Sequence, residues 1–452
     1  MFIGLIYSIA KRKQASEIED NDAYRYYVRA IMYKIFGGIT LAAVYAFYYG
    51  GGDTINYWSD AGILSNLMLR EPACYLDILF GDTGVENYFC FDNDTGRPEY
   101  YLKDKQSFTI PRVVSLFYLI TFKAFFGCTI LVAWVAFGGV WKMYLVFCEE
   151  YPRLKREFAI SILFVPSVLF WGSGILKDTF TFTAACWMTY SIYNIFIKQR
   201  DFKWNILYLI ISSWIIISIK PYIFVALLPG GFLWAFSNRI KEIGNPMLKV
   251  LAAPLILMVG VIGVSFFFAQ AASSLGDYGS VDTMLKKAVV TQDDLKRAYY
   301  GGNTFDIGAF EPTIPGILSK APIAIFSGMF RPTLLDTRNF VMLLSAVENT
   351  VVMLFFLYVL ITIGPIRYIS GIFAEPMAMF GFVFALFFSF AVGLTTANFG
   401  SLVRYKIPAI PFFLISLYIA RDRKLRLEEE LDETDTAFFD VQEEDDSRKA
   451  NH

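Results

Sequence analysis

A short polar segment follows the first long apolar stretch of the chain and contains the residue best suited to chemistry. The apolar stretch covers residues 30–50, and the segment "GGGDTINYW" runs on from Gly50. Glycine lets the backbone turn sharply and approach a ligand closely, and a carboxylate can act as a general base. Asp53, directly behind the glycines, is therefore the first candidate catalytic residue. Its structural alternative is a helix-end residue that caps the segment after it.

The composition is that of a membrane protein. Of the 452 residues, 56% are hydrophobic and 18% aromatic, whereas soluble domains are about 45–50% apolar. A formal net charge of −1 gives no global attraction to nucleic acid. The only histidine is His452, which leaves little room for histidine catalysis or histidine-rich metal sites. The chain has no phosphate-binding glycine loop, no Cys/His metal spacing and no G-x-S-x-G motif.

Apolar runs alternate with short charged connections, which predicts an all-α polytopic fold. A crossing needs about 20 helical residues, and about ten candidates are present. They cover residues 30–50, 113–147, 157–174, 179–197, 205–219, 221–237, 249–271, 342–363, 374–396 and 406–420. Lys and Arg gather in every second connection, which predicts by the positive-inside rule that both termini are cytoplasmic.

This topology divides the chain into three parts. Residues 1–29 form a cytoplasmic or interfacial segment, and residues 30–420 form the transmembrane domain. Two loops within that domain, 51–112 and 272–341, are expected to form small extracytoplasmic caps. The tail 421–452 is acidic and poor in aliphatic residues, and we expect it to be cytoplasmic and disordered.

Several cations fall at the expected outward turns, against the positive-inside bias. They are Lys177, Lys220, Arg331 and Arg404. Each could simply extend its charge to the lipid head groups. Together they describe a cationic surface at the outer leaflet. Arg binds phosphate through its bidentate fork and Lys as a point charge, so these residues are candidates for binding a lipid phosphate or pyrophosphate.

Other polar residues at the same expected depth could orient the two substrates of a transfer reaction, a sugar donor and its acceptor. We include Tyr57, Asp60, Asp178, Glu348 and Asn398 in this group. An aromatic ring can stack on a sugar face, although the aromatic belts of membrane proteins explain a tyrosine there equally well.

The cysteines and the carboxylates leave two further questions open. Cys74 and Cys90 share the first outer loop and could form a disulfide in an oxidising space. The remaining cysteines lie in or beside apolar runs and fit small core residues. No cofactor is required by any motif. If a divalent cation such as Mg²⁺ or Mn²⁺ takes part, Asp53 is the expected ligand.

The pattern resembles the GT-C class of membrane glycosyltransferases. Asp53 in "GGDTINYW" matches the acidic residue that this class places in its first outward loop. Arg404, Tyr405, Pro408 and Pro411 are similar to an "RY…P…P" segment of membrane glycosyltransferases and of bacterial polysaccharide polymerases and ligases. "PSVLFWGSGILKD" and "FRPTLLDTRN" resemble segments of bacterial envelope proteins. The resemblance implies a polyprenyl-phosphate-linked sugar as donor.

We therefore expect a glycosyltransferase or glycan polymerase in a bacterial inner membrane. It would transfer sugar on the periplasmic face from a polyprenyl-(pyro)phosphate carrier to an envelope glycan, lipid or protein. Its partners would be that donor, membrane lipids and proteins of an envelope complex, with no nucleic acid. Two alternatives stay open: a flippase or transporter of lipid-linked glycans, and a non-catalytic membrane subunit.

Overall fold

The structure is a computed structural model of the chain. It describes residues 1–244 except residue 82, then 280–297, 303–337 and 340–450, with only a few separate residues between 245 and 279. Side chains of the last helix are described as far as Leu431. Within these ranges the chain is helical, without strands, and its one β-bridge is antiparallel and joins Thr304 to Asn398.

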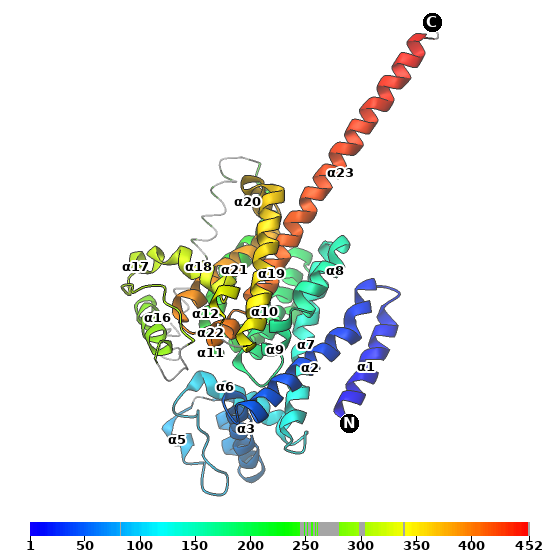
Figure 1. The fold of residues 1–452 in the computed structure, drawn as a ribbon. Helices are drawn as coiled ribbons and strands as arrows, with labels where there is room; N and C mark the ends of the chain where they lie inside the picture. Colours follow the sequence, from blue (N-terminus) through cyan, green and yellow to red (C-terminus); the bar gives the residue numbers. More distant parts are fainter. Residues whose placement is uncertain are drawn as a thin grey trace.

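The described helices fall into three groups along the chain (Figure 1). The first group is α1 (Phe2–Glu17), η1 (Asp22–Tyr26), α2 (Tyr27–Ala43), η2 (Val44–Tyr48), α3 (Asp53–Arg70), α4 (Pro72–Phe80), α5 (Val85–Tyr88) and α6 (Lys105–Tyr118). The second is α7 (Phe125–Glu150), η3 (Pro152–Leu154), α8 (Lys155–Phe158), η4 (Ala159–Leu163), α9 (Pro166–Trp171), α10 (Lys177–Ile192), η5 (Tyr193–Lys198), α11 (Phe202–Ile219), α12 (Pro221–Ala235) and α13 (Ser237–Glu242). The third is α16 (Val281–Leu295), α17 (Ile314–Ser319), α18 (Ala321–Phe330), η8 (Leu334–Asp336), α19 (Phe340–Ile363), α20 (Pro365–Ala374), α21 (Pro376–Thr395), α22 (Phe399–Tyr405) and α23 (Ala409–Ala450).

The described part of the chain contains five helices that are long and apolar enough to cross a membrane. They are Asp22–Tyr48, Phe125–Glu150, Phe202–Ile219, Met342–Ile363 and Pro376–Thr395. A sixth span results if α22 and α23, which bend by 59° at their junction, are counted together. The protein is thus an all-α chain with the helices of a membrane protein.

The number of spans differs from the expected ten for local reasons. The expected span 113–147 is split, because α6 ends at Tyr118 and α7 begins at Phe125. The span 157–174 is interrupted at Pro166, which starts the short helix α9. The span 179–197 corresponds to the 16-residue helix α10 and η5 after it, which are not among the helices long and apolar enough to cross a membrane. The span 221–237 is the 15-residue helix α12. The span 249–271 lies outside the described residues.

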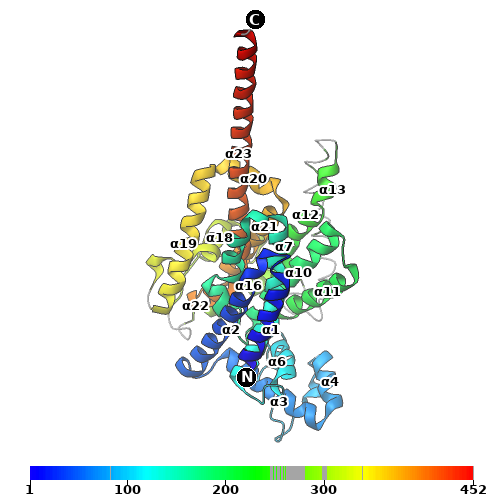
Figure 2. The same ribbon diagram turned by 90° about the vertical axis from the view of Figure 1, so that its right-hand side faces the viewer.

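The two ends of the molecule differ in their polar contacts. Helices α3, α5 and α6 form a cap at one end, whereas α20 and the long helix α23 lie at the other (Figures 1 and 2). The end opposite the cap has several ion pairs between different segments of the chain. Arg200 binds Glu149 through two hydrogen bonds of 3.0 and 2.7 Å, and Arg153 binds Glu429 through two of 2.9 and 2.7 Å.

The chain termini are not placed on one side. The first residue lies toward the cap, and the last lies beyond the opposite end (Figure 2). The prediction that both are cytoplasmic is therefore not confirmed. Helix α23 continues into the acidic tail and ends at Ala450.

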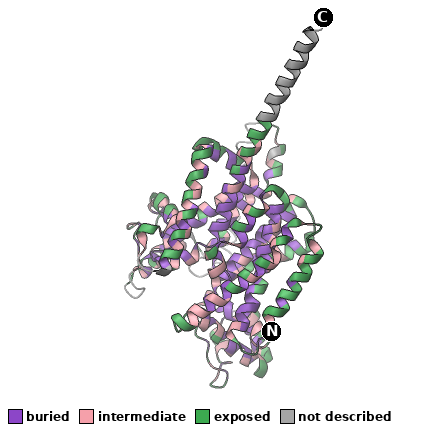
Figure 3. Ribbon diagram, turned by 45° about the vertical axis from the view of Figure 1, so that its right-hand side comes forward, coloured by how far each residue is buried: buried purple, intermediate pink, exposed green. Residues whose placement is uncertain are grey.

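Burial follows the pattern of a helix bundle in an apolar solvent (Figure 3). Large aromatic residues fill the interior: Trp234 of α12 stacks on Phe380 of α21 at 4.9 Å, and Phe384 meets Phe412 of α23 at 4.8 Å. Helix α11, by contrast, leaves residues such as Trp204 exposed at its surface. Apolar side chains on an outer face are what a lipid-facing helix requires.

The second expected outer loop, 272–341, contains a helix that we did not predict. Helix α18 is apolar and packs closely along α21. A Cβ atom added to Gly328 would overlap the carbonyl oxygen of Ser389, and one added to Gly393 would overlap that of Ala324. Small residues at such contacts let membrane helices approach closely. The loop is therefore partly integrated into the bundle.

This contact predicts a stability effect. Gly393→Ala should lower the melting temperature of the purified protein in detergent, because overpacking a close contact costs about 1–3 kcal/mol. Gly4→Ala is the matched control, since nothing lies within 4 Å of a Cβ at Gly4. Equal melting temperatures for the two variants would contradict the observed packing of α18 on α21.

Candidate functional site

A glycine turn fixes the position of Asp53. The first span ends at Tyr48, and Gly50 and Gly52 follow with φ angles of +66° and +108°, which side chains rarely adopt. The backbone thereby reverses and α3 begins at Asp53. The carboxylate stands in the first turn of that helix, where the helix dipole favours a negative charge. The turn thus presents Asp53 at the junction of span and cap.

Arg404 connects Asp53 to a second carboxylate. Its Nη1 lies 2.7 Å from Oδ2 of Asp53, and its Nε donates to Oδ2 of Asp178. Lys220 donates to the other oxygen of Asp178. The four charges therefore form one chain of ion pairs, which joins residues that are up to 351 positions apart in the sequence.

Helix ends supply the members of this chain. Asp178 lies in the first turn of α10, and Lys220 directly precedes α12. Arg404 is in the last turn of α22, which Asn398 caps by accepting hydrogen bonds from the backbone N–H groups of Gly400 (2.9 Å) and Ser401 (3.2 Å). Asn398 is thus a residue that positions the Arg404 helix.

Exposure is highest at Asp53 and low at the other members of the chain of charges. The Asp53 side chain is 40% exposed, that of Arg404 13%, that of Lys220 8% and that of Asp178 only 1%. A ligand approaching from outside would meet Asp53 first. Asp178, which we expected to orient substrate, instead lies behind Arg404 and fixes it.

A second ion pair lies in the cap. Lys177 donates to Oδ2 of Asp104 at 3.1 Å. Asp104 also caps α6 by accepting from the N–H of Ser107 at 3.0 Å, and it accepts from the Ser107 hydroxyl. Burial opposes ionisation here, but Lys177 and the Ser107 donors outweigh it and hold the pKa of Asp104 below its usual value. Sequence reasoning missed Asp104, although the "DKQS" spacing is typical of a helix cap.

Two of the expected orienting residues have structural contacts. Tyr57 is 1% exposed, its hydroxyl donates to Ser107 at 3.4 Å and its ring packs on Tyr100. Asp60 is 3% exposed and accepts from the backbone N–H groups of Glu99 (2.9 Å) and Tyr100 (3.1 Å). In this conformation neither can contact a sugar. Both hold the cap together.

Arg331 belongs to a different cluster. Its guanidinium binds Asp336 through two hydrogen bonds and lies beside the stacked rings of Phe305 and Phe399, at 4.9 and 5.0 Å from their centroids. The described contacts do not connect it to Asp53. It fixes the second outer loop to the start of α22, so the expected phosphate-binding role has no geometric support.

Glu348 lies near this second cluster. It accepts from the backbone N–H of Ser167 at 2.8 Å and from the Ser167 hydroxyl, and so joins α19 to α9. Lys406, at the break between α22 and α23, donates to the carbonyl oxygens of Met329 (3.2 Å) and Arg331 (2.9 Å). Glu348 is thus a helix-joining residue, outside the Asp53 chain.

One buried cation in the first span was missed. Lys34 is 3% exposed and donates to the carbonyl oxygen of Gly172 at 2.6 Å. This lysine could have been recognised in the sequence, because a charge inside the bilayer is costly and a single lysine within an apolar run therefore indicates a specific role.

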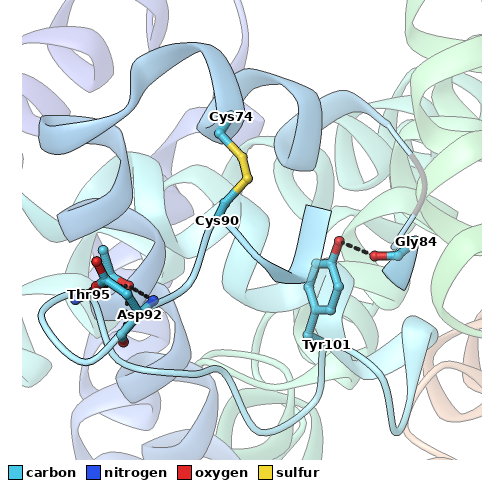
Figure 4. Close-up of a disulfide and its surroundings, with 6 residues drawn as sticks. All are labelled: Cys74, Gly84, Cys90, Asp92, Thr95 and Tyr101. Carbon is cyan, nitrogen blue, oxygen red and sulfur yellow. Dashed lines mark hydrogen bonds between the residues drawn. A yellow bond between two sulfur atoms is a disulfide. The ribbon is translucent and has the colours of Figure 1, made fainter. Parts of the chain in front are cut away.

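The cap also contains a disulfide between Cys74 of α4 and Cys90 (Figure 4). The sequence made this pairing possible, because both cysteines lie in the first expected outer loop. Nearby, the Tyr101 hydroxyl donates to the Gly84 carbonyl at 3.0 Å. Among the described residues, the one grouping with the composition of a metal site is Glu71, Cys74 and Cys90. The disulfide removes its thiolates, and Asp53 is not part of it.

Comparison of the chain with known proteins found no relative. No family model matches the chain, and no curated protein or solved structure is significantly similar to it.

The exposure gradient predicts unequal effects of neutralising the two carboxylates. Asp178→Asn leaves Lys220 and part of Arg404 buried without a counter-charge, which should cost about 3–5 kcal/mol of stability. Asp53→Asn removes a partly exposed partner and should cost about 1 kcal/mol or less. Melting temperatures in detergent measure both, and equal losses would contradict this assignment.

The Asp104–Lys177 pair predicts a pH dependence. Because the folded state lowers the pKa of Asp104, the pair stabilises the fold above the unfolded carboxyl value of about 4, and this contribution is lost as the pH falls through the folded-state pKa. The difference in melting temperature between wild type and Asp104→Asn should therefore shrink on acidification. A difference that stays constant below about pH 4 would overturn the prediction.

Proposed function

We propose that the protein is a membrane glycosyltransferase or glycan polymerase whose active site is the Asp53–Arg404–Asp178–Lys220 chain. The observation that carries the proposal is the arrangement of Asp53, an exposed carboxylate held beside a buried guanidinium at a helix start. A carboxylate suits a general base, and a guanidinium suits the charge of a departing phosphate.

The reaction would be a displacement at the anomeric carbon of a lipid-linked sugar. The acceptor hydroxyl attacks that carbon, and its proton passes to Asp53. The bond between the sugar and the phosphate oxygen breaks, and the negative charge that develops on the leaving phosphate is stabilised by Arg404. Lys177, near the same end of α10 and 18% exposed, supplies a further positive charge. No residue of the described site requires a metal for this step.

The side of the membrane follows from two independent features. The disulfide of the cap indicates an oxidising compartment, which is extracytoplasmic. The opposite end of the bundle has Arg153, Arg200 and Arg426, as the positive-inside rule expects of a cytoplasmic face. We therefore place the site on the outer face of the membrane, and in a bacterium this would be the periplasmic face of the inner membrane.

The donor class follows from depth and charge. The cations lie where spans end, so a ligand that reaches them from the bilayer must have an anionic head on an apolar tail. A polyprenyl phosphate or pyrophosphate has that form. The acceptor would be an envelope glycan, lipid or protein.

One observation favours transport as the second candidate. Arg404 and Lys406 lie at the 59° bend between α22 and α23, and transporters bind substrates at interrupted helices. A flippase of lipid-linked glycans would use the same cations to hold the phosphate during transfer across the membrane.

The first test measures glycan output in cells that lack the native protein and carry either wild type or Asp53→Asn. We expect loss of product at equal protein level, with accumulation of a lipid-linked precursor on the outer face. Asp94→Asn is the matched control, because that carboxylate is 83% exposed and pairs with Arg70 elsewhere in the cap. Normal output from Asp53→Asn would end the catalytic proposal, and precursor confined to the inner face would favour transport.

A further inference from the structure

Arg404 is shared by two carboxylates that are held very differently. Asp178 binds its Nε, is almost completely buried, and is held from its other oxygen by Lys220. Asp53 binds its Nη1 and is 40% exposed. The described part of the chain gives the Asp53 carboxylate no second hydrogen-bond partner.

The surroundings of Asp53 also permit movement. A Cβ added to Gly50 or Gly51 would meet nothing within 4 Å, whereas one added to Gly52 would lie 3.0 Å from the Tyr45 ring, so the first part of the turn before Asp53 is open. Asp178 has no such freedom, since its departure would leave the Lys220 ammonium buried without a counter-charge. One partner of Arg404 is therefore permanent, and the other can leave.

We propose that Asp53 is a displaceable partner of Arg404, and that the phosphate or pyrophosphate of an incoming ligand takes its place at Nη1. This inference rests on the proposed function and adds how the site is activated. While Asp53 is paired with Arg404, its Oδ2 accepts the guanidinium N–H and is not available to an acceptor hydroxyl. Displacement by phosphate gives Arg404 an equivalent anionic partner and frees the carboxylate to accept a proton.

The exchange replaces one ionic hydrogen bond of Arg404 with another of similar strength. A charge-assisted hydrogen bond between Arg404 and a carboxylate is replaced by one between Arg404 and a phosphate, which matches the guanidinium fork equally well. Asp178 and Lys220 stay in place and keep the guanidinium oriented. Asp53 therefore acts as an internal competitor for the anion. An enzyme without ligand would keep its base neutralised, which would limit attack by water on a donor that is not correctly bound.

The test is direct binding to the purified full-length protein in detergent. Two probes separate the sources of phosphate: a short-chain isoprenyl phosphate and inorganic pyrophosphate. We expect Asp53→Asn to bind the isoprenyl phosphate roughly tenfold more tightly than wild type, because a charged competitor has been removed. Asp94→Asn should bind as wild type does, and Arg404→Gln should lose binding. Pyrophosphate binding of equal strength would assign recognition to the phosphate alone.

A spectroscopic readout follows the carboxylate itself. Infrared difference spectra on probe binding should show a shift of one carboxylate stretch in wild type that is absent in Asp53→Asn. Melting curves confirm that each variant is folded, and Asp53→Ala repeats the binding test with a different side chain.

The outcomes separate this inference from the proposed function. Tighter binding by Asp53→Asn together with lost glycan output supports both proposals. Tighter binding with normal glycan output supports the exchange at Arg404 but overturns the role of Asp53 as general base. Weaker or unchanged binding by Asp53→Asn overturns the exchange, whatever the glycan output. Absence of binding of either probe to wild type and to Asp53→Asn also overturns it, because no anion then competes for Arg404.

Discussion

The guanidinium of Arg404 is the interaction on which the candidate site depends. It binds the carboxylates of Asp53 and Asp178, and Asp178 in turn binds Lys220. Four helices, α3, α10, α12 and α22, are thereby joined at one point. A buried charge is costly unless it is paired and hydrogen-bonded, so each member constrains where the others can lie. Neighbouring elements position the members of this ion pair: Asn398 caps the helix of Arg404, and the glycine turn before α3 places Asp53 beside it.

The rest of the cap end is built from polar residues that hold the backbone in place. Asp60 fixes the chain at Glu99 and Tyr100, and Asp104 joins the cap to Lys177. Arg331, beside the stacked rings of Phe305 and Phe399, attaches the segment 303–337 to the start of α22. Such networks resemble a binding surface when only residue types are considered. Their burial and hydrogen bonds show that they stabilise the frame around the Asp53–Arg404 pair.

Much of the fold could be read from the sequence because the bilayer imposes a simple requirement. A spanning helix must satisfy its backbone internally and present apolar side chains, so long apolar runs predict helices. The spans at residues 30–50, 205–219, 342–363 and 374–396 correspond to helices of the structure. Where the runs were too long or were interrupted by proline, as at 113–147 and at Pro166, hydropathy could not locate the break. Helix α18 was missed because its ten residues are too few to register as a span.

The sequence by itself determined the helical class and the candidate charges at helix ends, because each depends on local composition or spacing, and it left the pairing of Cys74 and Cys90 open. It also identified Asp53, Lys220, Asp178 and Arg404 as residues of one expected depth. Only the tertiary structure decided which of them touch. Ion pairing joins side chains that are 42 to 351 positions apart, and no local pattern encodes such a distance. Burial likewise depends on neighbouring helices. Tyr57 and Asp60 were chosen for their chemistry, but they are buried and hold the cap together. Asp104, which was not chosen, pairs with Lys177 next to the candidate site.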